Sequence, residues 1–174
     1  MRPMKRGKIN LNEKKRKSNR QLKIIGLVLI LTVVLVSIVL IQSASPMRQA
    51  KKQGVALSRE VAGIEEVTDF YWFTRDKTYF TVVGNDEKNV GKIVFLPQDG
   101  EEAVIMNQSD GIDDTTAIQN VLDLKETKKI KKISLGLYKN EAVWEVVANS
   151  NQGGINYYLV SFKDGKILNT IKDI

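Results

Sequence analysis

One strongly apolar stretch without a charged residue, residues 24–41, limits what the rest of the chain can be. It reads IIGLVLILTVVLVSIVLI and holds 18 residues. As a helix it would be about 27 Å long, close to the hydrocarbon thickness of a bilayer. Its polar side chains belong to Thr32 and Ser37, whose hydroxyls can each bond a carbonyl one turn earlier. A chain of 174 residues is too small to bury such a helix easily, so we predict a transmembrane helix over residues 24–41.

Charge is distributed unequally on the two sides of this stretch. Residues 1–23 carry ten Lys/Arg and one acidic residue, Glu13, which is a net charge of +9. Residues 42–174 carry 17 Lys/Arg and 19 Asp/Glu, which is −2, so the overall +7 comes from the tail. Basic residues beside a membrane span stay on its cytoplasmic side. We therefore predict a single-pass protein of the cell membrane, with residues 1–23 as a basic cytoplasmic tail and the C-terminal domain extracellular.

A cleaved signal peptide is the alternative interpretation of the same stretch. The hydrophobic region of a signal peptide usually holds 7–15 residues, fewer than the 18 found here. Cleavage after Ala44 would place Gln42 at the −3 position, and cleavage after Ser45 would place Pro46 next. The chain has no cysteine, which excludes a lipoprotein. We interpret the stretch as an uncleaved signal-anchor.

The basic tail has almost no apolar residues and is expected to be disordered. One interpretation is an orientation signal attracted to anionic headgroups, and the other is a docking arm for a cytoplasmic partner or nucleic acid. No aromatic residue lies among the basic residues of positions 1–23, so base stacking has no support. We predict no nucleic-acid partner.

The composition excludes several kinds of catalytic site. The chain has no cysteine and no histidine, which removes thiol chemistry, Ser–His–Asp triads and histidine-bound zinc. It also lacks Ser-x-x-Lys, Gly-x-Ser-x-Gly and the Gly-x-x-x-x-Gly-Lys phosphate loop. Asp110, Asp113 and Asp114 do not follow the spacing of a calcium loop and are better explained by a turn and a helix cap. We predict no enzymatic activity, no metal site and no cofactor.

The first part of the exported region has a helical period followed by a strand period. Ser45-Pro46 is typical of a helix start, and Gly63 of a helix end. The predicted buried stripe of this helix is Met47, Ala50, Gly54, Leu57, Val61 and Ile64, at spacings of three and four. Four strands rich in β-branched and aromatic residues are then predicted at 67–74, 78–84, 90–96 and 103–106.

The second part repeats this order. Asp113 or Asp114 is predicted to cap a helix whose buried stripe is Ala117, Ile118, Val121 and Leu122. Four further strands are predicted at 130–138, 142–148, 155–162 and 167–171. Element order and turn chemistry repeat although few residues are identical, which is typical of a structural repeat. The predicted fold class is α+β: two tandem units, 46–108 and 109–174, each with a helix lying across its own four-stranded antiparallel sheet.

Two residue clusters are candidate contact surfaces. On a strand, Phe70 and Trp72 face one side while Tyr71 and Phe73 face the other. One pair can be covered by the helix, and the other is either packed against the second unit or open to a partner. The second cluster is Lys125, Lys128, Lys129, Lys131 and Lys132. These lysines are either a solvated helix end and loop, or a contact for anionic wall polymer or lipid headgroups.

Several short runs of the exported region resemble a known family. Residues 144–146 read WEV, 158–168 read YLVSFKDGKIL, 79–86 read YFTVVGND and 95–97 read FLP. Together with the short basic tail and the single N-terminal span, these runs resemble the YpmB/TseB-like proteins of Firmicutes. The WEV run and the GKIL run are also similar to PepSY-type units.

The resemblance implies two tandem cystatin-like units on the outer face of the membrane. It also implies a non-enzymatic regulator of cell-wall elongation that binds a class B penicillin-binding transpeptidase. The alternative is a PepSY-like envelope module that binds a ligand or inhibits a protease. An exposed apolar patch would favour the regulator, and a deep pocket lined by Lys129, Lys131 and Lys132 would favour the alternative.

Overall fold

The computed structural model describes residues 28–34, 36–37 and 45–172 of the chain. The predicted tail lies outside these residues, and so does part of the predicted span, of which 28–34 and 36–37 are helical. Within this helix Thr32 Oγ1 donates to Val28 O at 2.9 Å and Ser37 Oγ donates to Val33 O at 2.8 Å, as predicted. Over the described residues, no helix has both the length and the apolar character needed to span a bilayer.

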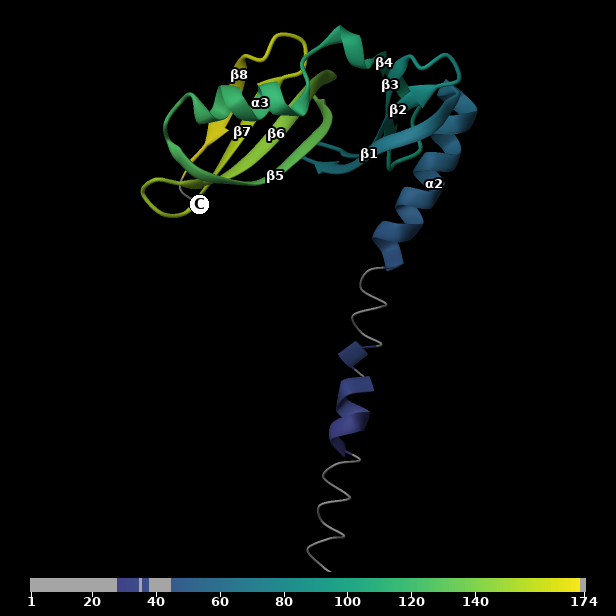
Figure 1. The fold of residues 1–174 in the computed structure, drawn as a ribbon, viewed down its shortest axis with the longest axis horizontal. Coiled ribbons are helices and arrows are strands. Elements are labelled where there is room, and N and C mark those ends of the chain that lie inside the picture. Colours follow the sequence, from purple (N-terminus) through teal and green to yellow (C-terminus); the bar gives the residue numbers. More distant parts are fainter. Residues whose placement is uncertain (1–27, 35, 38–44, 173–174) are drawn as a thin grey trace, which may run out of the picture. The chain divides into compact units, whose positions relative to one another are not determined.

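A helix and a four-stranded sheet come first in the described C-terminal region (Figure 1). The helix and strands are α2 (Ser45–Ala62), β1 (Ile64–Thr74), β2 (Thr78–Asp86), β3 (Gly91–Pro97) and β4 (Val104–Asn107). The strands are antiparallel, and their order in the sheet is their order in the chain. This first sheet therefore has β1 and β4 at its edges.

The second half begins with a short 3-10 helix and repeats the pattern (Figure 1). Its elements are η1 (Gln108–Asp110), α3 (Asp114–Leu122), β5 (Thr127–Tyr138), β6 (Glu141–Ser150), β7 (Ile155–Ser161) and β8 (Ile167–Ile171). These four strands are also antiparallel and sequential. The prediction of an α+β fold with two four-stranded antiparallel sheets is confirmed.

Local chemistry explains where the helices begin and end. Gly63 has a φ of +65°, and its N–H bonds the Arg59 carbonyl at 3.0 Å, so α2 ends in the left-handed turn predicted there. Asp113 precedes α3, and its side chain accepts a hydrogen bond from Thr116 N at 2.8 Å. Hydrogen bonds from Thr116 also hold the pKa of Asp113 below its usual range. Asp113 is therefore the N-cap that the sequence indicated.

The packed face of α2 differs from the predicted stripe. Gly54 and Ser58 are buried, whereas Leu57 and Val61 are 43% and 40% exposed. A Cβ on Gly54 would lie only 3.3 Å from the Phe70 ring, so the helix approaches the sheet closely along its small residues. Gly54 belongs to the predicted stripe and is buried as expected, but the prediction was wrong for Leu57 and Val61, because side-chain size, and not hydrophobicity, decides the closest approach.

Two cores lie on opposite faces of the first sheet. The smaller core holds Ile64, Val82, Val94 and Leu96, with Phe70 and Val55 packed against it, and it joins the sheet to α2. The larger core combines side chains of both halves. From the first sheet it takes Phe73, Tyr79, Val83, Ile93 and Phe95, and from the second half it takes Ala117, Val121, Leu135, Trp144, Val146, Tyr158 and Phe162 among others. The two sheets are thus closed by one shared hydrophobic core.

The second half also departs from the prediction in two details. In α3, Ala117 and Val121 are buried as predicted, but Leu122 is 36% exposed and Ile118 is only partly buried. Strand β5 begins at Thr127 and not at residue 130, so its first residues are the lysine-rich ones. High lysine content lowers the apparent strand propensity of this segment, which explains the missed start.

Candidate functional site

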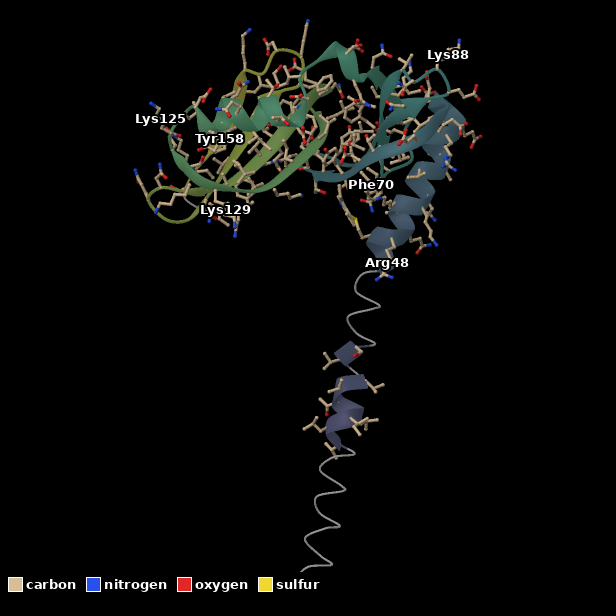
Figure 2. The ribbon with its side chains drawn as sticks, in the orientation of Figure 1. Arg48, Phe70, Lys88, Lys125, Lys129 and Tyr158 are labelled. Atoms are coloured by element: carbon tan, nitrogen blue, oxygen red, sulfur yellow. The ribbon has the colours of Figure 1, made fainter. Side chains whose placement is uncertain are left out.

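The four aromatic residues predicted as a partner surface lie on β1. Phe70 stacks on Phe80 with ring centroids 6.1 Å apart, and Trp72 meets the same ring edge-on at 5.1 Å. Phe70 also lies beside Gly54 of α2 (Figure 2). Both Phe70 and Trp72 are half-buried, so the helix-facing side of the strand is occupied mainly by packing within the chain.

The other two aromatic residues of the run pack against the second sheet. Tyr71 meets the Trp144 ring edge-on at 5.6 Å. Phe73 is fully buried, and a Cβ on Gly136 would overlap its ring. Packing between the two halves, one of the two alternatives, therefore accounts for this pair. Contact between the half-buried residues of this aromatic run and a partner protein stays a prediction.

The turn between β1 and β2 contacts the second sheet through polar groups that the sequence did not single out. Arg75 forms an ion pair with Glu145, which is 7% exposed, and its guanidinium lies 5.4 Å from the centre of the Tyr157 ring. Thr81 Oγ1 on β2 donates to the Leu135 carbonyl at 2.7 Å, and both residues are buried. Arg75 lies between the strands predicted at 67–74 and 78–84, and nothing in a local pattern reveals a partner seventy residues away.

The lysine cluster lies at the start of β5 and is exposed to solvent (Figure 2). Lys125 has a φ of +56° in the turn before the strand, and the other four lysines are strand residues. The interpretation as a helix end and loop was therefore wrong for the strand residues, although their solvation is as expected. The pairing of β5 with β6 shifts twice here, between Thr127 and Lys129 and between Ile130 and Lys132. A role in binding anionic polymer or lipid stays a prediction.

A cleft of about 420 Å³ opens between the two sheets, and we call it the inter-sheet cleft. It is lined mainly by Asp69, Tyr71, Asp113, Asp114, Trp144 and Phe162, with Thr68 and Thr116. Burial raises the pKa of the Tyr71 phenol well above its ordinary value, and Asp69 and Asp114 raise it further. The phenol is therefore a hydrogen-bond donor at neutral pH. The lining contains neither lysine nor arginine, so this cleft favours a cationic or hydrogen-bonding group.

A second cleft, of about 510 Å³, lies where edge strands of the two halves meet. Val104 and Met106 of β4 line it together with Leu168 of β8. Val104 and Leu168, which we call the edge patch, are 42% and 47% exposed, and Ile105 on the other face of β4 is 44% exposed. The sequence missed this patch because short apolar strands were expected to be buried. Neither of these two clefts is lined by Lys129, Lys131 or Lys132.

Comparisons with known proteins add the following similarities. Residues 53–97 match the family model described as the cell wall elongation regulator TseB-like domain. The solved structure of the YpmB protein from Bacillus subtilis is similar with a TM-score of 0.63 and 24% identity, over 70% of this chain and 95% of that chain. A putative lipoprotein from Clostridium difficile covers 70% of this chain and 91% of its own, with 13% identity and a TM-score of 0.37. Among curated proteins, none matches this chain.

Proposed function

We propose, from the TseB-like domain that residues 53–97 form, that this chain is a non-enzymatic regulator of cell wall elongation. The match confirms the resemblance to the YpmB/TseB-like family predicted from the sequence. The matched residues include most of α2 and the strands β1 to β3. This match is the single observation that carries the proposal.

The regulator is proposed to act from the outer face of the membrane. Residues 24–41 would be its single span, residues 1–23 its cytoplasmic tail, and residues 46–174 its exported part, built as two cystatin-like units. The charge difference between +9 before the span and −2 after it supports this orientation. A span would confine the exported part to a thin layer beside a membrane-bound partner, which raises the effective concentration of each for the other.

The proposed partner is a membrane-bound enzyme of cell-wall synthesis, a class B penicillin-binding transpeptidase. The edge patch supports a contact mechanism, because two large apolar side chains from two edge strands line the same cleft and are open to solvent. Edge strands also offer unpaired backbone groups to a partner. A photo-crosslinking residue at Val104 should capture a protein that binds labelled penicillin, and the same residue at Lys88, on the exposed β2–β3 turn (Figure 2), should not.

Tethering is tested by comparing three forms of the protein at native level in a strain that lacks it. Residues 46–174 secreted behind a cleavable signal should fail to restore growth or cell shape, because the effective concentration falls. The same residues on a foreign membrane span should restore both, because only proximity is required. Full rescue by the secreted form would overturn the proximity mechanism, and an active cytoplasmic reporter fused after residue 174 would overturn the orientation.

The inter-sheet cleft favours a second candidate function, an envelope module that binds a ligand or inhibits a protease. Its volume of about 420 Å³ is sufficient for a small ligand or a peptide side chain. Asp69→Asn with Asp114→Asn would remove two carboxylates that lie near the Tyr71 phenol. Loss of cellular function in this variant, with crosslinking from Val104 unchanged, would favour the ligand-binding function over the contact mechanism.

A further inference from the structure

The outward face of α2 forms a groove of about 440 Å³ that the proposed regulator function does not use. Its lining, which we call the basic groove, consists of Arg48, Lys51, Lys52, Val55, Ala56 and Arg59. Positions three and four apart share one face of a helix, and these six positions follow that spacing over more than three turns. Two small or medium apolar side chains thus lie between four cations on one helix face.

Within the described part of the chain, none of the four cations of the basic groove forms a salt bridge. The groove lining contains no carboxylate. Arg59 makes one weak hydrogen bond, to the Glu65 carbonyl at 3.4 Å. Gly54 and Ser58 on another side of the helix are buried against the first sheet. The packing of α2 therefore turns this face outward, and Arg48 extends from its N-terminal end (Figure 2).

We infer that the basic groove docks on the anionic phospholipid headgroups of the membrane, an inference that rests on the proposed anchoring by residues 24–41. Arg48 lies seven positions after residue 41, so even a fully extended connection spans at most about 25 Å. Positive charge complements an anionic bilayer surface. The long stems of Arg48, Lys51 and Lys52 can lie along apolar material while their charged ends reach phosphates.

This docking orients the exported part as well as holding it near the bilayer. Because α2 packs directly on the first sheet, a helix face held at the headgroups determines which faces of that sheet point away from the membrane. Each basic residue near an anionic surface contributes roughly fivefold to binding. The attraction is screened beyond about 8 Å at physiological salt, so we expect the contact to be lost at high salt.

The test uses the full-length chain, which has no cysteine of its own. Ala56→Cys places a single fluorophore on the exposed basic groove. The labelled protein is placed in nanodiscs of phosphatidylcholine with or without phosphatidylglycerol, and quenching by the neutral solute acrylamide is measured. We expect quenching to fall several-fold when phosphatidylglycerol is present and to return at high salt.

Charge-neutral variants separate this groove from the other lysine cluster. The variant R48Q/K51Q/K52Q/R59Q should abolish the lipid-dependent protection, and the smaller variant K51Q/K52Q should weaken it partly. The matched control K128Q/K129Q/K131Q/K132Q removes four exposed charges from β5 and should leave protection intact. Equal quenching in both kinds of nanodisc, or equal protection in the quadruple groove variant, would overturn the inference.

Two further measurements distinguish a failure of the inferred docking from a failure of the proposed anchoring. A label at Thr32→Cys should be inaccessible to acrylamide in either lipid if residues 24–41 span the bilayer. If that label is accessible while the label at Ala56→Cys is still protected by anionic lipid, the docking stands and the anchoring fails. If soluble inorganic polyphosphate protects the label at Ala56→Cys and anionic lipid does not, the groove binds a polymer and the lipid docking is wrong.

Discussion

The contact between Gly136 and Phe73 predicts how the two sheets depend on each other. Gly136 lies on β5, and a Cβ there would overlap the Phe73 ring of β1, which is fully buried and has no space to move into. Overpacking a core by one methyl group typically costs 1–3 kcal/mol. Replacing glycine also restricts the unfolded chain, which offsets about 0.4–1 kcal/mol. We therefore expect Gly136→Ala to lower the free energy of unfolding by about 1–2 kcal/mol.

A double-mutant cycle identifies the ring as the cause. Phe73→Ala alone should cost about 3–5 kcal/mol, as for other buried phenylalanines. The double variant should cost about 1–2 kcal/mol less than the sum, since the added methyl group then occupies vacated space. Gly84→Ala is the matched control, because its Cβ would overlap the Glu66 backbone carbonyl. Removing the Phe73 ring should not relieve that overlap.

Urea unfolding of residues 46–174, followed by tryptophan fluorescence, measures each free energy. Thermal unfolding is a second measurement, in which each kcal/mol should shift Tm by roughly 3–6 °C. Additive costs for Gly136→Ala and Phe73→Ala, within about 0.5 kcal/mol, would show that the two residues do not touch. An increase in stability for Gly136→Ala alone would refute the packing of β1 on β5.

Three further predictions follow from other contacts of the second sheet. Trp144→Ala should lower the free energy of unfolding by about 3–5 kcal/mol, because the indole is 5% exposed and donates to the Ile112 carbonyl at 3.0 Å. An unchanged Tm would show that the Trp144 side chain does not face the core. Arg75→Ala should cost about 3 kcal/mol by leaving buried Glu145 unpaired, and adding Glu145→Gln should recover part of that loss. The Lys166 ammonium and other donors lower the pKa of Asp164 to about 2, so its contribution is present above about pH 4 and lost towards pH 2. Asp164→Asn should therefore reduce the pH dependence of Tm in that range. An unchanged dependence of Tm on pH there would contradict the prediction.

Elements marked by local chemistry could be predicted from the sequence. Gly63 and Asp113 determine a helix end and a helix start through backbone groups that lie within four residues of each. The alternation of side chains along β1 and β2 is a property of any strand. The order of helices and strands and the α+β class follow from such local signals.

Features that depend on distant residues could not be predicted. The closest contact of α2 is made by Gly54 against Phe70 and Leu96, and the pattern that placed Gly54 on the buried stripe also placed Leu57 there, which is 43% exposed. The ion pair of Arg75 joins residues seventy positions apart. Both clefts are lined by residues of the two halves together. The pattern of residues along one segment contains no information about such contacts between distant residues.

The candidate surfaces were predicted in part. The aromatic run on β1 was recognised together with its two alternatives, and packing between the halves accounts for Phe73 and Tyr71. The cations of α2 do not belong to the predicted stripe, and the hydrophobic pattern did not single them out. Their importance depends on the absence of carboxylates from the groove lining, which requires the arrangement in space.

Because the two sheets share one core, the first sheet stays prone to aggregation until the second half of the chain has been synthesised. Synthesis delivers β4 some 55 residues before Phe162, and at about 5–20 residues per second this interval lasts roughly 3–11 s. During that time the first sheet has no cover for Ile93 and Phe95, which the finished protein buries. The growing chain therefore presents an apolar sheet face with open edges, the kind of surface on which strands of neighbouring chains pair. A factor that shields nascent chains would have its greatest effect within this interval, and a chain truncated after β4 would keep that face exposed for its whole lifetime.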